Sequence, residues 1–148
     1  MSLRLSSWIA LCLALSCALV AARSRATNAP AYRVIVHPQN PLQEIPRAML
    51  ADAFLKKVTR WPDGQAIRPV DQPSSSNVRK SFTDDVLRRS VGAVKSYWQQ
   101  LIFSGRDIPP PELESDAAVR DYVLRNRGAV GYVSGATELQ AAKAIGVR

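Results

Sequence analysis

The sequence predicts an α/β fold built on a small sheet, and three observations carry this prediction. Segments rich in β-branched and aromatic residues recur at 32–36, 65–70 and 129–133. Helical patterns rather than hairpin turns separate these segments, which is typical of layered α/β folds. The chain of 148 residues is long enough for one such domain. The tail at 137–148 is ambiguous, with a helical pattern at 138–143 and a candidate last strand at 144–147.

Four helices are expected, with limits set by capping residues and prolines. Their expected ranges are 46–55, 76–87, 90–104 and 115–127. Pro46 suits the first position of a helix, and Ser90 and Ser115 precede apolar patterns as N-cap residues. The prolines at 109–111 force an extended connector before the last helix.

Apolar spacing gives the expected faces of these helices. In the second helix, Val78, Phe82 and Val86 recur every four residues and are expected to face the core. Arg79 and Lys80 are expected to face solvent. The third helix is expected to bury a broad apolar face made of Val91, Val94, Tyr97, Trp98, Leu101 and Ile102.

The first 31 residues have the pattern of an export signal and a short leader. Arg4 precedes an apolar run over residues 8–22, and small residues before Ala22 suit cleavage there, with Ala26 as a second option. The sequence therefore predicts a signal peptide at 1–22, a flexible leader at 23–31 and a domain at 32–148. The run is short for a span of about 20 residues. We expect no stable membrane span after cleavage and a periplasmic or secreted protein, with an uncleaved anchor as the alternative.

Both cysteines, Cys12 and Cys17, lie within the signal segment. The domain is therefore expected to have no disulfide, thiolate nucleophile or cysteine-ligated metal. Lipidation of Cys17 stays an alternative, although the leucine expected three residues before it is missing. His37 is the single histidine, so no zinc site is expected, and no cofactor is indicated.

The charge pattern argues against nucleic acid, and the motifs argue against catalysis. The chain has 20 basic and 12 acidic residues and a formal charge of +8, but its basic residues are scattered and do not alternate with aromatic ones. We expect a solvated basic surface. No G-x-S-x-G motif is present, and a triad of Ser76, His37 and Asp71 has no supporting motif. The chain is therefore expected not to be an enzyme.

A serine-rich stretch at 70–82 is the candidate functional site. It has the pattern of a strand end, a polar turn and the first turns of a helix. The stretch places Ser74, Ser75, Ser76 and Asn77 where a helix start offers unpaired backbone N–H groups, and Arg79 follows one turn later. This is the chemistry of a small oxyanion site and equally that of an ordinary helix cap.

Three motifs resemble the phosphate-binding proteins of ABC transporters. They are F-L-K-K-V-T-R-W-P-D-G at 54–64, Y-W followed by F-S-G and prolines over 97–111, and R-G-A-V-G-Y-V at 127–133. The resemblance implies a type 2 periplasmic-binding-protein-like fold with a small mixed sheet flanked by helices. Full-length members have two lobes with the oxyanion held between them, and this chain has room for one lobe. Ligands of such folds bind at strand-to-helix loops.

The resemblance also implies that the serine loop corresponds to the oxyanion-binding loop of the family. With Phe82 set on the family's phenylalanine, Ser76 and Arg79 match the family's serine and arginine, whereas Gln72 and Val78 replace an arginine and a threonine. The implied oxyanion ligands are Ser74, Ser75, Ser76, Asn77 and Arg79. Two functions follow as expectations: an exported solute-binding-like domain for phosphate or another oxyanion, or a non-catalytic interaction or regulatory domain of the cell envelope. The expected protein partner is an envelope or transporter protein.

Overall fold

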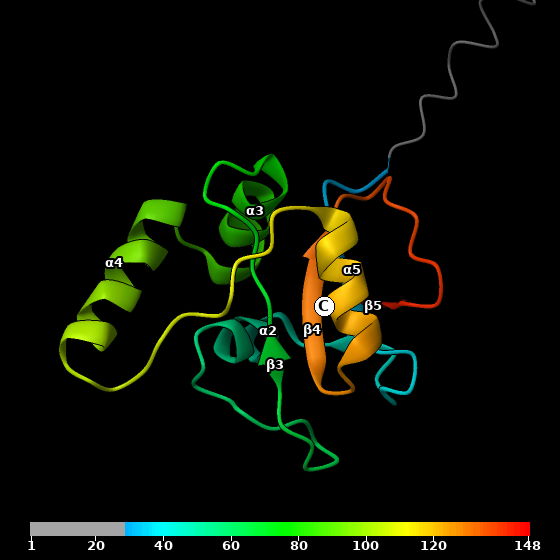
Figure 1. The fold of residues 1–148 in the computed structure, drawn as a ribbon, viewed down its shortest axis with the longest axis horizontal. Helices are drawn as coiled ribbons and strands as arrows, with labels where there is room; N and C mark the ends of the chain where they lie inside the picture. Colours follow the sequence, from blue (N-terminus) through cyan, green and yellow to red (C-terminus); the bar gives the residue numbers. More distant parts are fainter. Residues whose placement is uncertain (1–28) are drawn as a thin grey trace, which may run out of the picture.

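A five-stranded mixed sheet organises residues 29–148, the part of the chain that the computed structural model describes (Figure 1). The strands stand in the order β2-β5-β1-β4-β3. Their bounds are β1 (Arg33–Val36), β2 (Glu44–Ile45), β3 (Arg68–Pro69), β4 (Ala129–Val133) and β5 (Lys143–Val147). The central strand β1 runs antiparallel to β4 and β5, while β3 is parallel to β4 and β2 is parallel to β5. The predicted α/β fold with a small mixed sheet is confirmed.

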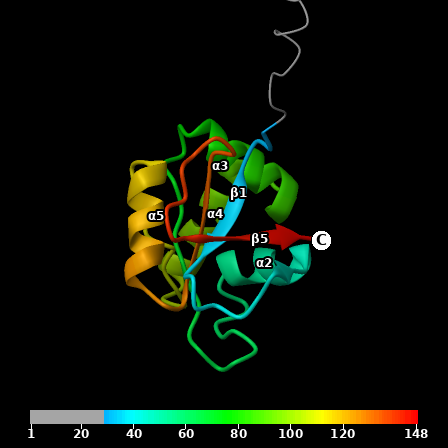
Figure 2. The same cartoon turned by 90° about the vertical axis from the view of Figure 1, so that its right-hand side faces the viewer.

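Strands β1 and β5 pair over a short length and then diverge. Val34 stands opposite Ile145 and Val36 opposite Lys143. Beyond these pairs β5 turns towards β2, which binds it through the pair Ile45 and Val147. Figure 2 shows β5 running across β1 rather than alongside it for its whole length.

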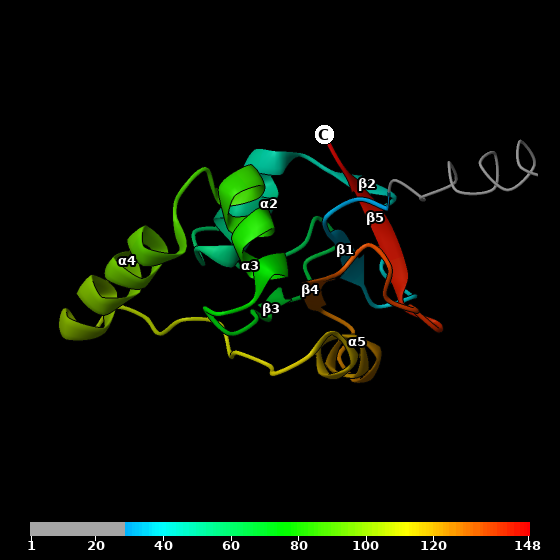
Figure 3. The ribbon, with the colours of Figure 1, turned by 90° about the horizontal axis from the view of Figure 1, so that it is seen from above.

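Helices cover both faces of the sheet. Their bounds are α2 (Arg47–Phe54), α3 (Asn77–Phe82), the π-helical turn η2 (Thr83–Leu87), α4 (Val91–Phe103) and α5 (Asp116–Arg125). In Figure 3, α5 lies on one side of the sheet and α2 and α3 lie on the other. Side chains alternate between the two faces along β1. On one face, Ile35 packs with Val119 and Val123 of α5. On the other face, Val34 and Val36 pack with the larger cluster, which contains Phe82 and residues of α2.

Helix α4 stands away from the sheet (Figures 1 and 3). Trp98, which is 4% exposed, and Val94 join the core, and the Tyr97 hydroxyl donates to the carbonyl oxygen of Leu55 at 2.9 Å. The broad buried face expected for this helix is therefore too wide, because Ile102 is 49% exposed. The side of α4 that meets the end of α2 packs into the core, whereas Ile102 lies largely outside it.

The predicted starts of α4 and α5 are confirmed, and in both a serine side chain caps the helix. Ser90 and Ser115 accept hydrogen bonds from the N–H groups of Ala93 and Ala118, as N-caps do. Pro46 is itself the residue before α2 and not its first helical residue, which corrects the expected start.

The helix expected over 76–87 has a different inner face. Arg79, Phe82, Thr83 and Val86 are all buried, and they follow the 3, 4 and 7 spacing of one helix face. The expectation that Arg79 faces solvent is wrong for this reason. The segment also changes from an α-helix to a π-turn after Phe82 and ends at Arg88, whose φ of 53° is left-handed.

The remaining differences lie in short or ambiguous segments. The tail forms the strand β5, so the helix alternative at 138–143 is wrong. Strand β2 was not expected, because two residues are too few to show an alternating pattern. The predicted signal peptide at 1–22 and most of the predicted leader at 23–31 lie outside the described residues. Within residues 29–148, no helix is both long and apolar enough to cross a membrane.

Candidate functional site

The serine loop and the loop after β4 meet at one edge of the sheet. Strands β3 and β4 are parallel, so their carboxyl ends point the same way. The chain leaves β3 through Val70 and Asp71 and reaches the serine loop, and it leaves β4 at Ser134. Loops in this position are where open α/β sheets hold ligands, so the polar groups here define the candidate site.

Ser76 is the N-cap of α3. Its hydroxyl oxygen accepts a hydrogen bond from the backbone N–H of Arg79 at 3.2 Å, and the hydroxyl donates to Oε1 of Gln72 at 2.7 Å. Both bonds stay within the loop and its helix. The hydroxyl predicted to bind an oxyanion therefore fixes the start of the helix in this structure.

Gln72 joins the two loops. This side chain is 4% exposed, and its Nε2 donates to Oδ1 of Asp116 at 2.8 Å and to the carbonyl oxygen of Tyr132 at 2.9 Å. Oδ2 of Asp116 in turn accepts from the backbone N–H of Ser134 at 3.0 Å and from the hydroxyl of Thr137 at 2.5 Å. The Gln72 amide is thus fully engaged inside the protein.

Oxygen atoms of three residues bind the Arg79 guanidinium. Its Nη2 is 3.0 Å from Oδ2 of Asp71, and its Nη1 is 2.5 Å from Oε1 of Glu112 and 2.5 Å from the carbonyl oxygen of Gln72. The side chain is 6% exposed, and its Nε is buried with no hydrogen-bond partner among residues 29–148. The guanidinium is therefore balanced by two carboxylates and is not presented at the surface.

The buried carboxylate of Asp71 binds both Arg79 and Tyr132. Burial raises its pKa, and the charge of Arg79 and the hydrogen bond from the Tyr132 hydroxyl oppose that rise. Burial and the charge of Asp71 raise the pKa of Tyr132 well above its ordinary value, so the phenol keeps its proton and donates a hydrogen bond to Asp71. We give the name carboxyl-end network to the buried residues Asp71, Gln72, Arg79 and Tyr132 together with the partly buried Asp116.

The five predicted site residues divide into two groups. Ser76 and Arg79 bind members of the carboxyl-end network, whereas Ser74, Ser75 and Asn77 are exposed on the loop above it. The backbone N–H groups of Asn77 and Val78 belong to the first turn of α3, which the helix itself leaves unpaired. The outer part of the loop therefore offers free neutral donors.

Sequence reasoning missed Glu112, Asp116 and Tyr132. Glu112 reaches Arg79 because the connector after the prolines lies beside the loop, where the N–H of Leu113 donates to the carbonyl oxygen of Asp71 at 2.9 Å. No local pattern signals a partner 33 residues away. Within residues 29–148, no cluster of His, Cys, Asp and Glu suited to a metal ion is present.

The described residues form one cavity beside the serine loop and a larger one away from it. The smaller, of about 310 Å³, lies beside Ser74 and Arg79 and is bordered by α4 and by the connector at Pro109 and Glu112. We call it the α4 cavity.

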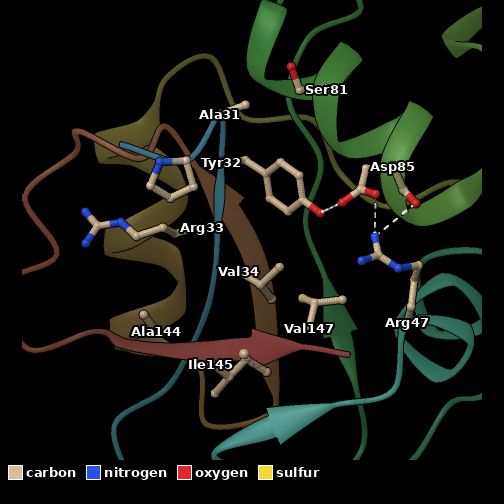
Figure 4. A pocket seen from close by; sticks show the side chains of 12 residues that line it. Ala31, Tyr32, Arg33, Val34, Arg47, Ser81, Asp85, Ala144, Ile145 and Val147 are labelled. Atoms are coloured by element: carbon tan, nitrogen blue, oxygen red, sulfur yellow. Dashed lines mark hydrogen bonds and ion pairs between the residues drawn. The ribbon is translucent and has the colours of Figure 1, made fainter. Parts of the chain in front are cut away.

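The larger cavity, of about 700 Å³, opens where β1 and β5 diverge (Figure 4). At its wall, Nη1 of Arg47 is 2.6 Å from Oδ1 of Asp85, and the Tyr32 hydroxyl donates to the other oxygen of that carboxylate. Burial and this bond raise the pKa of Tyr32 to about 12. The Asp85 carboxylate at this wall is therefore engaged by both Arg47 and Tyr32.

The comparisons with known proteins agree with this architecture. Residues 31–147 match the family described as the PBP superfamily domain, so the chain belongs to that family. No curated protein matches the chain.

Several solved structures share the fold. A protein from Clostridium perfringens, assigned as a phosphate ABC transporter substrate-binding protein and solved with bound phosphate, aligns with a TM-score of 0.61 at 18% identity over 79% of this chain and 44% of its own. An ABC-type phosphate transport receptor from Vibrio cholerae gives 0.61 at 22% identity, covering 79% of this chain and 46% of its own. PstS from Borrelia burgdorferi gives 0.60 at 14% identity, covering 80% and 47%.

This chain spans less than half the length of each of these three structures. The resemblance to phosphate ABC transporter substrate-binding proteins is confirmed, and so is the expectation of a PBP-like lobe.

Proposed function

We propose that this protein is an extracytoplasmic solute-binding-like domain that binds phosphate or a related oxyanion at the serine loop. The observation that carries the proposal is the exposed row Ser74, Ser75 and Asn77 above the rigid carboxyl-end network. Their hydroxyl and amide groups and the free N–H groups of the first helical turn are donors suited to anionic oxygen. Membership of the PBP superfamily and the phosphate bound in the Clostridium perfringens structure support the choice of ligand.

The geometry gives Ser76 and Arg79 a supporting role in this proposal. Both hold the loop in place, because their polar groups already bind Gln72, Asp71 and Glu112. Neutral donors at an exposed position each contribute about 0.5–1.5 kcal/mol. Three or four such bonds correspond to an affinity of about millimolar.

A titration of the purified protein tests this function. Phosphate, sulfate and arsenate are added while the backbone amide signals of residues 74–79 are followed by NMR. We expect saturable shifts at millimolar anion that weaken at least severalfold in the triple variant Ser74→Ala, Ser75→Ala, Asn77→Ala. Ser96→Ala is the control, because Ser96 is an exposed serine of α4 away from the loop. Absence of saturable shifts with all three anions rejects the proposal.

The extracytoplasmic location rests on the signal-like pattern of residues 1–22. The terminal sequence of the mature protein tests it: we expect Arg23 first if cleavage follows Ala22, or Thr27 if it follows Ala26. Recovery of an intact Met1 in the membrane fraction rejects cleavage. The proposed domain begins at residue 32, and we propose no catalytic activity for it.

A second candidate function is a protein-interaction domain of the cell envelope. The specific observation is an exposed apolar group around the end of α4, where Ile102 is 49% exposed, Phe103 89% and Ile108 66%. Its partner would be an envelope or transporter protein. Crosslinking from position 103 in intact cells tests this candidate, and crosslinks no more frequent than those from the exposed position 100 reject it.

A further inference from the structure

The α4 cavity adjoins the serine loop and is larger than an inorganic anion requires. Ser74 forms its edge towards the loop, and its volume is about 310 Å³. Cavities near 300 Å³ are at the lower end of those that hold small organic molecules. An anion bound at Ser74 would therefore have empty, partly apolar space beside it.

Helix α4 supplies one wall of this cavity with a single face. Lys95, Trp98, Gln99 and Ile102 all line it, and their spacing of 3, 4 and 7 residues places them on one side of the helix. Trp98 is 4% exposed and forms the floor, whereas Ile102 is 49% exposed and stands at the mouth. The position of α4 away from the sheet has the effect of leaving this face open to a ligand.

The charges around the cavity leave one cation available. Glu112 lines the cavity, but its carboxylate is 2.5 Å from Nη1 of Arg79, and that guanidinium also binds Asp71. Lys95 makes no ion pair with any residue in the described part of the chain, 29–148. A lysine ammonium on its flexible stem can reach an anion at the cavity edge.

We infer that the ligand of this site is an organic phosphate or phosphonate rather than inorganic phosphate. Its anionic group binds between Ser74 and Lys95, and its apolar part lies on Trp98 and Ile102, with Gln99 beside it. This inference rests on the proposed oxyanion function and adds the class of ligand. Burial of an aromatic or branched apolar group against these walls tightens binding about tenfold or more relative to the bare anion.

The test compares three probes on the purified protein by NMR titration or calorimetry. The probes are phenyl phosphate, inorganic phosphate and phenol, which separate the combined ligand from its anionic half and its aromatic half. Lys95→Gln removes the cation, and Ile102→Glu places a charge at the cavity mouth. Phe103→Glu is the matched control, because Phe103 is next in sequence, is 89% exposed and does not line the cavity. Thermal unfolding of the three variants confirms that each is folded.

We expect phenyl phosphate to bind at least about tenfold more tightly than inorganic phosphate and than phenol. Lys95→Gln is expected to remove the advantage over phenol, Ile102→Glu is expected to remove the advantage over inorganic phosphate, and Phe103→Glu is expected to keep both. If inorganic phosphate binds as tightly as phenyl phosphate, the inference is wrong and the proposed function stands. If phenol matches phenyl phosphate, the cavity does not select an anion and the inference is again wrong. If no anion binds at all, both the inference and the proposed function are wrong.

Discussion

The carboxyl-end network and the α4 cavity lie side by side, but their charged groups differ in burial and in ion pairing. In the network, Arg79 is 6% exposed and binds two carboxylates and a backbone oxygen. In the cavity, Lys95 is exposed and has no ionic partner within residues 29–148. Serine residues divide in the same way, because Ser76 is engaged by Gln72 whereas Ser74 is free at the surface.

This difference shows where binding capacity remains in the domain. A buried charge must be paired to offset its loss of hydration, and the pairing uses up its hydrogen-bonding directions. Exposed groups have no such requirement. The network therefore gives the loop its shape, and a ligand has to be recognised by the outer, weaker groups.

The largest expected effect comes from opening the network at Arg79. Arg79→Met leaves the carboxylate of Asp71, a residue only 7% exposed, without its cation. Loss of one partner of a buried ion pair costs about 3–5 kcal/mol, and we expect a decrease of that size in the free energy of unfolding measured with urea. Lys80→Met, at the adjacent exposed position, is expected to change it by less than about 0.5 kcal/mol. Equal stabilities of the two variants would contradict the assignment of Arg79 to a structural role.

A smaller effect is expected from two matched tyrosines. Tyr132 is fully buried, and its hydroxyl donates to Asp71 and accepts from the N–H of Gln72. Tyr97 is partly buried and donates to one backbone carbonyl. Tyr132→Phe should therefore cost about 1–3 kcal/mol and Tyr97→Phe about 0.5–1 kcal/mol, measured by thermal or urea unfolding. A larger loss of unfolding free energy for Tyr97→Phe than for Tyr132→Phe would contradict the conclusion that the network contributes more to stability than the contact of α4.

The smallest effect is a pH dependence outside both regions. Hydrogen bonds from Arg47 and Tyr32 hold the pKa of Asp85 below its ordinary value of 3.8. Its stabilising contribution is therefore present above pH 3.8 and is lost as the pH falls through the lowered pKa. Because the Asp85 side chain is 42% exposed, the contribution is about 0.5–1 kcal/mol.

Unfolding experiments between pH 5 and pH 2 measure this dependence. This interval extends roughly one to two pH units to either side of the usual pKa of an aspartate. The wild type should lose stability relative to Asp85→Asn as the pH falls. Asp84→Asn, at the neighbouring exposed position, should retain the wild-type slope. Parallel curves for the wild type and Asp85→Asn would show that this ion pair contributes nothing.

Features with local signals could be predicted from the sequence. Ser90 and Ser115 cap helices because a cap needs only the next three residues. Residues 129–133 form β4 because a short, wholly apolar run suits a buried strand. The tail is ambiguous in sequence because its last strand is fixed by pairing between Ile145 and Val34, which no local pattern contains.

The site was predicted in position but not in detail. The serine loop does follow a strand and precede a helix. The direction of Arg79 was missed because Val78, Phe82 and Val86 also make an apolar series, and the choice between two overlapping faces depends on Asp71 and Glu112. An arginine can join an inner face when carboxylates from other segments meet it there.

The pairing of β1 also bears on when the chain can fold. This central strand binds β4 and β5, and Val34 meets a residue about 110 positions later in the sequence. Contacts of such long range form slowly, because the whole intervening chain must be closed into a loop first. The sheet cannot acquire its central pairs until residues 129–147 have been synthesised. The complete sheet therefore forms only when nearly the whole chain is available, and a chain that ends before residue 129 lacks both neighbours of its central strand.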